Sequence, residues 1–100
     1  MGFCTVEDVK LRLGLSPEET AYDEELSALV EEASEVAAAI LGESWPSPEE
    51  APRLVRYATA NIAAGIFRRL RGTPGEGEPL YRLGLEELEF YKRSRGAVRA

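Results

Sequence analysis

The stretch PRLVRYATANIAAGIFRRL, residues 52–70, decides the fold of this chain of 100 residues. Within its centre, residues 57–67, the only polar side chains are Thr59 and Asn61. Proline is tolerated in the first turn of a helix, so we expect a helix that begins near Pro52. Because apolar residues point in every direction around this helix, it must be covered on all sides. We expect the other elements of so small a chain to be too few for this, which favours association with a second copy.

A second long helix is predicted before it, over Asp23–Leu41. Apolar residues recur there at the three- and four-residue spacing of one helix face. They are Leu26, Leu29, Val30, Ala33, Val36, Ala37, Ile40 and Leu41. Glutamates fill the positions between them, Asp23 is expected to cap the first turn, and Gly42 is typical of a helix end.

Two further helices flank the long pair. Thr5 and Asp8 have the spacing of a capping box, and Gly14 supplies a stop, so a short helix is predicted at the N-terminus. The segment with Pro46 and Pro48 is a linker in which Trp45 is expected to fold over the core.

After an acidic, glycine-rich loop over residues 72–79, the last helix is predicted over residues 80–92, with Leu83 and Phe90 off its main apolar face. The fold class is therefore all-α, a small four-helix bundle with two long central helices, a short N-terminal helix and a C-terminal helix. One domain should span residues 1–95, with residues 96–100 as a flexible C-terminal tail.

Charge is segregated along the chain. Residues 1–50 hold thirteen acids and two bases, whereas residues 51–100 hold five acids and ten bases. Opposed charges orient a partner or a second copy of the same protein. We expect a subunit interface formed by Glu31, Glu32, Glu35, Arg53 and Arg56.

Basic residues gather near the ends of the last two helices. The candidate partner-binding set is Arg68, Arg69, Arg71, Lys92, Arg93, Arg95 and Arg99. These side chains complement the negative ends of helix dipoles, or they form a docking surface, and the sequence leaves both interpretations open. Nucleic-acid binding is the weaker alternative, because the many acids elsewhere oppose phosphate.

Catalytic chemistry has little support in the sequence. The chain has no histidine and a single cysteine, Cys4, so the commonest general base, the commonest zinc ligands and an intrachain disulfide are all lacking. We expect no enzyme activity, no metal and no cofactor. No stretch approaches the roughly 20 apolar residues that span a bilayer, so no membrane partner is predicted.

The order of these features resembles the head–tail connector (adaptor) proteins of tailed bacteriophages and prophages. The resemblance covers residues 3 to about 92 and rests on four helical patterns. They are Thr5-x-x-Asp8-x-Lys10-x-x-Leu13, Asp23-x-x-Leu26-x-x-Leu29-Val30-x-x-Ala33, the closing Leu41-Gly42, and a helix led by Pro52 and Leu54 that carries Ala58 and Ile62-Ala63.

The resemblance implies a virion structural protein at the head–tail junction, made in the cytoplasm of a bacterial host. Such subunits assemble as a ring, commonly a dodecamer, beneath the portal protein, and they receive the next connector or tail protein while DNA passes through the lumen without sequence-specific binding. The family often extends its C-terminus into the portal, whereas residues 96–100 are short. The alternative function is a small helical regulatory module that binds a single protein partner through its arginines.

Overall fold

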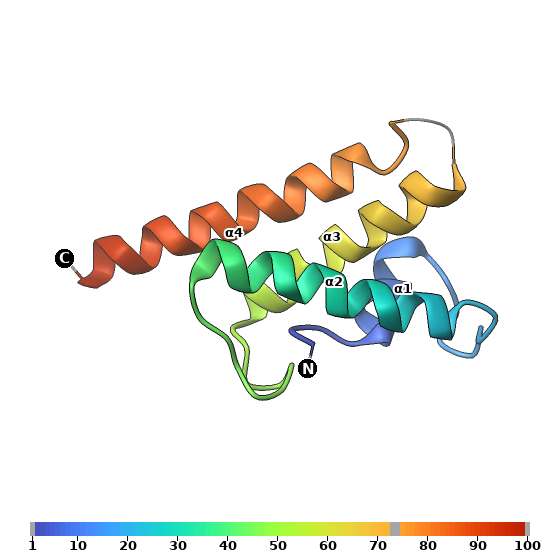
Figure 1. The fold of residues 1–100 in the computed structure, drawn as a ribbon, viewed down its shortest axis with the longest axis horizontal. Helices are drawn as coiled ribbons and strands as arrows, with labels where there is room; N and C mark the ends of the chain where they lie inside the picture. Colours follow the sequence, from blue (N-terminus) through green and yellow to red (C-terminus); the bar gives the residue numbers. More distant parts are fainter. Residues whose placement is uncertain (1, 73–74, 100) are drawn as a thin grey trace.

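The computed structural model describes residues 2–72 and 75–99, and for residues 96–99 it describes the backbone alone. Four helices form the whole of the regular structure in these ranges: α1 (Val6–Leu13), α2 (Asp23–Leu41), α3 (Arg53–Arg71) and α4 (Glu78–Arg99). Figure 1 shows α3 and α4 running antiparallel, with α1 and α2 packed on the other side of α3. The predicted all-α fold of four helices is confirmed.

Helix α3 is the centre of the structure, because it packs against each of the other three helices. Every residue from Ala58 to Gly65 is buried, on all sides of the helix. The apolar side chains around the centre of α3 are therefore covered within one chain. The sequence argument that α3 needs a second copy to cover it was wrong, because α4 packs along α3 more closely than the sequence indicates.

Glycine permits that close approach. A methyl group added at Gly84 of α4 would lie 2.6 Å from the Ala58 carbonyl oxygen and 2.6 Å from Ile62 Cγ1. On α3, a methyl group at Gly65 would lie 2.7 Å from the backbone nitrogen of Tyr81. The two helix backbones thus meet at positions that only glycine fits.

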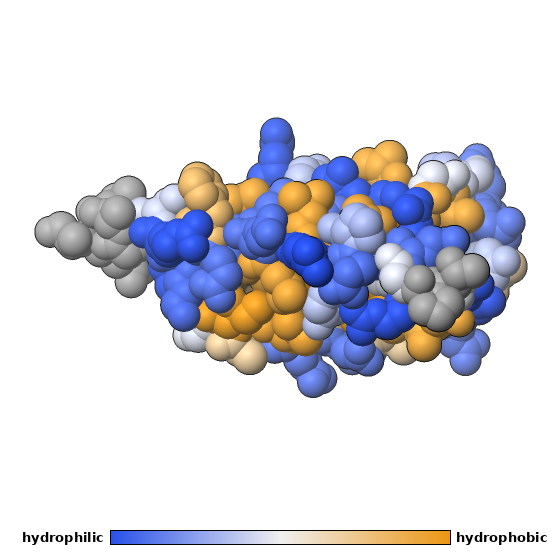
Figure 2. All heavy atoms as spheres, turned by 90° about the horizontal axis from the view of Figure 1, so that it is seen from above, coloured by the Kyte–Doolittle hydropathy of each residue, from blue (hydrophilic) through white to orange (hydrophobic). Residues whose placement is uncertain are grey.

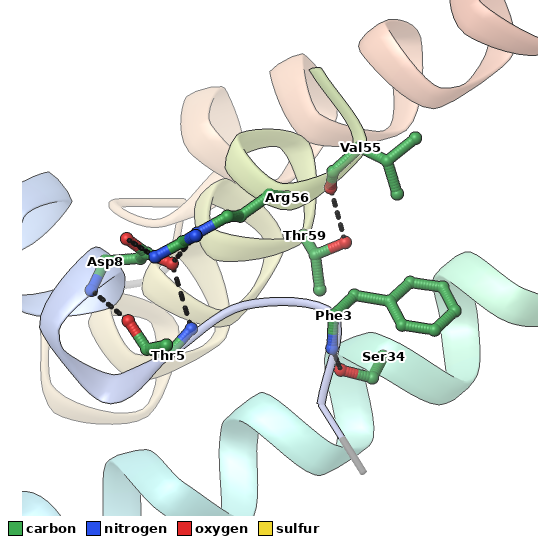
Figure 3. Close-up of polar contacts among 7 residues, drawn as sticks. All are labelled: Phe3, Thr5, Asp8, Ser34, Val55, Arg56 and Thr59. Carbon is green, nitrogen blue, oxygen red and sulfur yellow. Dashed lines mark hydrogen bonds and ion pairs between the residues drawn. The ribbon is translucent and has the colours of Figure 1, made fainter. Parts of the chain in front are cut away.

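Both polar side chains in the apolar stretch of α3 have hydrogen-bond partners. The Thr59 hydroxyl donates to the Val55 carbonyl at 2.7 Å, within its own helix, as Figure 3 shows. The Asn61 amide donates to the Glu87 carboxylate of α4 at 2.9 Å. These bonds offset part of the cost of burying polar groups, while Asn61 Oδ1 is buried without a hydrogen-bond partner among the described residues.

The N-terminal segment is fastened to α2 by Ser34. Its hydroxyl accepts a hydrogen bond from the Phe3 backbone at 2.8 Å and donates to the Val30 carbonyl at 2.7 Å; Figure 3 shows the Phe3 bond. Phe3 packs edge-to-face on Trp45 with ring centroids 5.4 Å apart. Trp45 thus lies over the core, as predicted from the sequence.

The start of α2 is capped by a different residue from the one predicted, although its bounds, Asp23–Leu41, are those predicted from the sequence. Tyr22 is the N-cap of α2, and Asp23 begins the helix. The Asp23 carboxylate lies 2.8 Å from Lys10 Nζ, so an ion pair with α1 occupies the side chain that we expected to cap α2. Lys10 is buried and also donates to the Pro17 carbonyl at 3.2 Å, which ties the α1–α2 loop to both helices.

Helix α4 is longer than predicted at both ends, because it includes Glu78 and Pro79 and continues to Arg99. Proline is compatible with the first turn of a helix, so α4 begins before Pro79 and not after it. At the other end, Arg95 contacts Glu43 and donates to the Leu41 carbonyl, and these contacts tie α4 to the end of α2. Most of the predicted tail is thus helical, and Ala100 lies outside the described residues.

Ile62 tests the central role of α3. Its side chain is fully buried within the subunit, so Ile62→Ala should lower the free energy of unfolding by about 2 to 5 kcal/mol through lost burial and a residual cavity. Urea denaturation measures this change. The matched control is Leu11→Ala on α1, where the side chain is 72% exposed and the cost should stay within about 0.5 kcal/mol. Equal midpoints for the two variants would contradict the central position of Ile62.

Candidate interaction surfaces

The outer face of α2 carries the largest group of carboxylates without ionic partners. Glu24, Glu31, Glu32 and Glu35 are exposed, and none of them takes part in an ion pair within the described residues. A hollow of about 160 Å³ opens beside them, lined by Phe3, Glu31, Ser34, Glu35, Ala38 and Ser44. The three predicted interface glutamates therefore share one helix face and are accessible.

Arg56, predicted at the same interface, is bound inside the subunit. Its guanidinium donates to both carboxylate oxygens of Asp8, at 2.7 and 3.3 Å, across 48 residues of sequence. Asp8 also closes the predicted capping box, since its carboxylate accepts from the Thr5 backbone at 2.9 Å and its own backbone donates to the Thr5 hydroxyl at 3.1 Å. Figure 3 shows Asp8 held between Thr5 and Arg56. Arg53, one turn earlier, is exposed.

The electrostatics of this pair follow from its geometry. Burial alone would raise the pKa of Asp8, but hydrogen bonds from Arg56 and Thr5 outweigh burial and lower it. The hydrogen bond to Asp8 raises the pKa of Arg56 in turn. Both groups are thus charged at neutral pH, and the pair joins α1 to α3. Sequence reasoning missed this role, because it treated Asp8 only as part of a helix cap.

Cys4 is a buried free cysteine beside this pair. Burial, and secondly the charge of Asp8, raise the pKa of its thiol to about 12. The described residues hold no group of three His, Cys, Asp or Glu side chains that could bind a metal ion.

The structure divides the predicted basic cluster into two groups. Arg68, Arg69 and Arg71 lie at the C-terminal end of α3, whereas Lys92 and its neighbours lie at the C-terminal end of α4. Because α3 and α4 are antiparallel, these ends lie at opposite sides of the molecule in Figure 1, along its 45 Å axis. The single basic concentration that the sequence indicated is therefore not formed in space.

Several of these arginines are also engaged within the chain. Arg69 bonds Glu78 at 3.2 Å and lies 4.8 Å from the Tyr81 ring centroid. Arg71 contacts Glu25 and stacks on Tyr22.

The remaining members of the set differ in whether they are engaged within the chain. Arg95 is held at the end of α2 by Glu43 and the Leu41 carbonyl. Arg68, Lys92 and Arg93 form no ion pair with another described residue and are the members most available to a partner. The side chain of Arg99 lies outside the described residues.

The outer face of α4 is a surface that the interface predictions did not include. Leu83 and Phe90 on this face are 44% and 56% exposed. A shallow groove of about 360 Å³ runs along the same helix, lined by Arg82, Leu85, Glu86, Glu89 and Arg93. Figure 2, which views the molecule from the α4 side, shows apolar residues reaching the surface between charged ones. The departure of Leu83 and Phe90 from the main apolar face was the sequence signal for this surface.

Comparison with known proteins adds no relative. No protein-family model, curated protein or solved structure matches the chain. None of the helices in the described ranges is long and apolar enough to cross a membrane.

The Asp8–Arg56 pair predicts a specific pH dependence. The folded state lowers the pKa of Asp8 below its unfolded value of about 3.9, so the pair stabilises the fold above that pH, and its contribution is lost as the pH falls through the folded pKa. Asp8→Asn should cost about 1 to 3 kcal/mol at pH 7 and less at pH 2. Unfolding free energies measured from pH 7 to pH 2 test this, with Glu50→Gln in the exposed linker as the control. A constant difference between Asp8→Asn and wild type at all pH values would contradict it.

Proposed function

We propose that this protein is a phage virion structural protein, a head–tail connector subunit that forms a ring beneath the portal and joins capsid to tail. The four-helix, all-α fold agrees with what the resemblance implies. A connector subunit acts through its surfaces and needs no catalytic centre, so the proposal rests on the distribution of charge.

The observation that carries the proposal is the exposed, unpaired acidic face of α2, with Arg53 exposed elsewhere on the same subunit. Ring closure requires a heterologous interface in which one surface of a subunit meets a different surface of its neighbour. The α2 glutamates of one copy and the Arg53 region of the next supply opposite charges for such a contact. Arg56 contributes indirectly, because its bond to Asp8 fixes the start of α3.

The two basic groups suit contact with one protein on each side of the ring. Arg68 lies at one end of the subunit's long axis, and Lys92 and Arg93 lie toward the other. A connector has to bind the portal protein on one side and the next connector or tail protein on the other. Any α2 glutamates that remain uncovered in the lumen would repel passing DNA and prevent it from adhering.

Reversing the α2 charges tests the ring. The triple variant Glu31→Lys, Glu32→Lys and Glu35→Lys should weaken ring assembly, most strongly at low salt, where repulsion is least screened. Each exposed pair contributes under about 1 kcal/mol, so a cluster is changed rather than one residue. Light scattering and electron microscopy, with and without purified portal ring, measure assembly.

Two comparisons make this test specific. Adding Arg53→Glu to the triple variant should recover part of the assembly, because the contact then carries opposite charges again. The control variant Glu49→Lys with Glu50→Lys changes exposed charges in the linker and should assemble normally. Full assembly by the triple variant at every salt concentration would contradict the proposed interface. A stable one-to-one complex with a partner, and no ring, would favour the regulatory module instead.

A further inference from the structure

The outer face of α4 combines charge and apolar exposure in a symmetric order. Residues 78, 82, 85, 89 and 93 follow one another at three- and four-residue spacings, and residue 86 is four residues after 82 and three before 89, so all six lie on one face of the helix. Their identities are Glu, Arg, Leu, Glu, Glu and Arg. Arg82 and Glu89 are equidistant from a point between Leu85 and Glu86, and Glu78 and Arg93 are equidistant from the same point.

We propose that this face binds a second copy of the chain, with the two α4 helices antiparallel about a two-fold axis that passes beside Leu85. A two-fold axis places residues that are equidistant from it opposite each other. Arg82 then meets Glu89 of the other copy, and Glu78 meets Arg93, each contact occurring twice. Opposite charges face each other at both levels, and this complementarity identifies the occupant as a second copy.

The exposed apolar residues lie on one flank of the same face. Leu83 and Phe90 are seven residues apart, so they lie on the same edge of the α4 face. In the antiparallel pair, Leu83 of one copy and Phe90 of the other lie on a common flank, two residues apart in level, where each partly shields the other from water. The groove along Arg82, Leu85, Glu86, Glu89 and Arg93 receives the facing helix.

The central charge contacts carry most of the specificity. Glu78 already bonds Arg69 at 3.2 Å and lies 3.7 Å from Arg82 within its own subunit, so its contact with Arg93 adds less. Glu86 is the one position at which like charges approach each other across the axis. Its neutral variant, Glu86→Gln, should therefore tighten the dimer.

The dimer is expected to be weak and concentration-dependent. A contact confined to one helix from each copy belongs with small interfaces that bury less than about 1,200 Å² in total. The proposal does not rest on the connector function, because its central residues, Arg82 and Glu89, are not in the ring interface proposed above. Arg93 lies in the α4 dimer contact and also in the basic group proposed to bind a partner protein. Pairing through α4 and docking through Arg93 therefore exclude each other.

Sedimentation equilibrium of the full chain, from micromolar to millimolar concentration, tests the proposal. Wild type should show a monomer–dimer equilibrium. Arg82→Glu and Glu89→Arg should each weaken the dimer about tenfold, because each change replaces two attractions by two repulsions. The same chain carrying both changes should dimerise as wild type does, since residue 82 again meets its opposite charge at residue 89.

Matched controls separate the contact from general effects of charge and hydrophobicity. Glu50→Arg in the linker makes the same charge change as Glu89→Arg and should leave the dimer unchanged. Phe90→Ala should weaken the dimer, whereas Leu11→Ala should not, because α1 does not pack against α4. Circular dichroism should show equal helicity for all variants.

A chain that stays monomeric at every concentration would overturn the proposal. A dimer insensitive to Arg82→Glu, or one that the double change fails to restore, would overturn it as well. Ring assembly that depends on the α2 glutamates, together with no α4-dependent dimer at any concentration, would overturn the α4 dimer and leave the connector function standing.

Discussion

The rest of the structure depends on the need to cover α3 on every side. A helix whose central residues are buried all around must have neighbours in each direction, and in this chain α1, α2 and α4 supply them. The closest neighbour is α4, whose Gly84 lets the two backbones meet at Ala58. Because three elements are engaged around one axis, most of the apolar surface is used inside the subunit. Leu83 and Phe90 of α4 are among the large apolar side chains that remain exposed.

Polar contacts then fix how the covering helices are oriented. Asp8 and Arg56 join α1 to α3, Lys10 and Asp23 join α1 to α2, and Arg95 joins α4 to the end of α2. Each contact joins residues from different parts of the chain and engages groups that would otherwise be available at the surface. A charged side chain that is engaged in a contact between helices is therefore not available to bind a partner.

The charges that remain unpaired describe what the surface offers. The α2 glutamates form an acidic face, and Arg68 and Lys92 lie in the C-terminal parts of α3 and α4, which run in opposite directions (Figure 1). Along α4, acidic and basic residues follow an order in which Arg82 and Glu89, and Glu78 and Arg93, are symmetrically placed. These features support the proposal that the protein acts through contacts with other proteins. The proposed ring contact through α2 and the proposed two-fold contact through α4 use different faces of the subunit.

The sequence by itself determined the helices, because helix periodicity, capping residues and glycine stops act over a few residues. The all-α class, the capping box of Thr5 and Asp8 and the bounds of α2 followed from such local signals. Only the tertiary structure decided which charged residues remain available. Arg56 and Arg71 were candidate binding residues in the sequence, and both are occupied by acids far away along the chain. The basic residues that form one group in the sequence lie at two ends in space, because α3 and α4 run antiparallel. Pairing of this kind depends on which helix faces pack together, and the global requirement to cover α3 sets that arrangement.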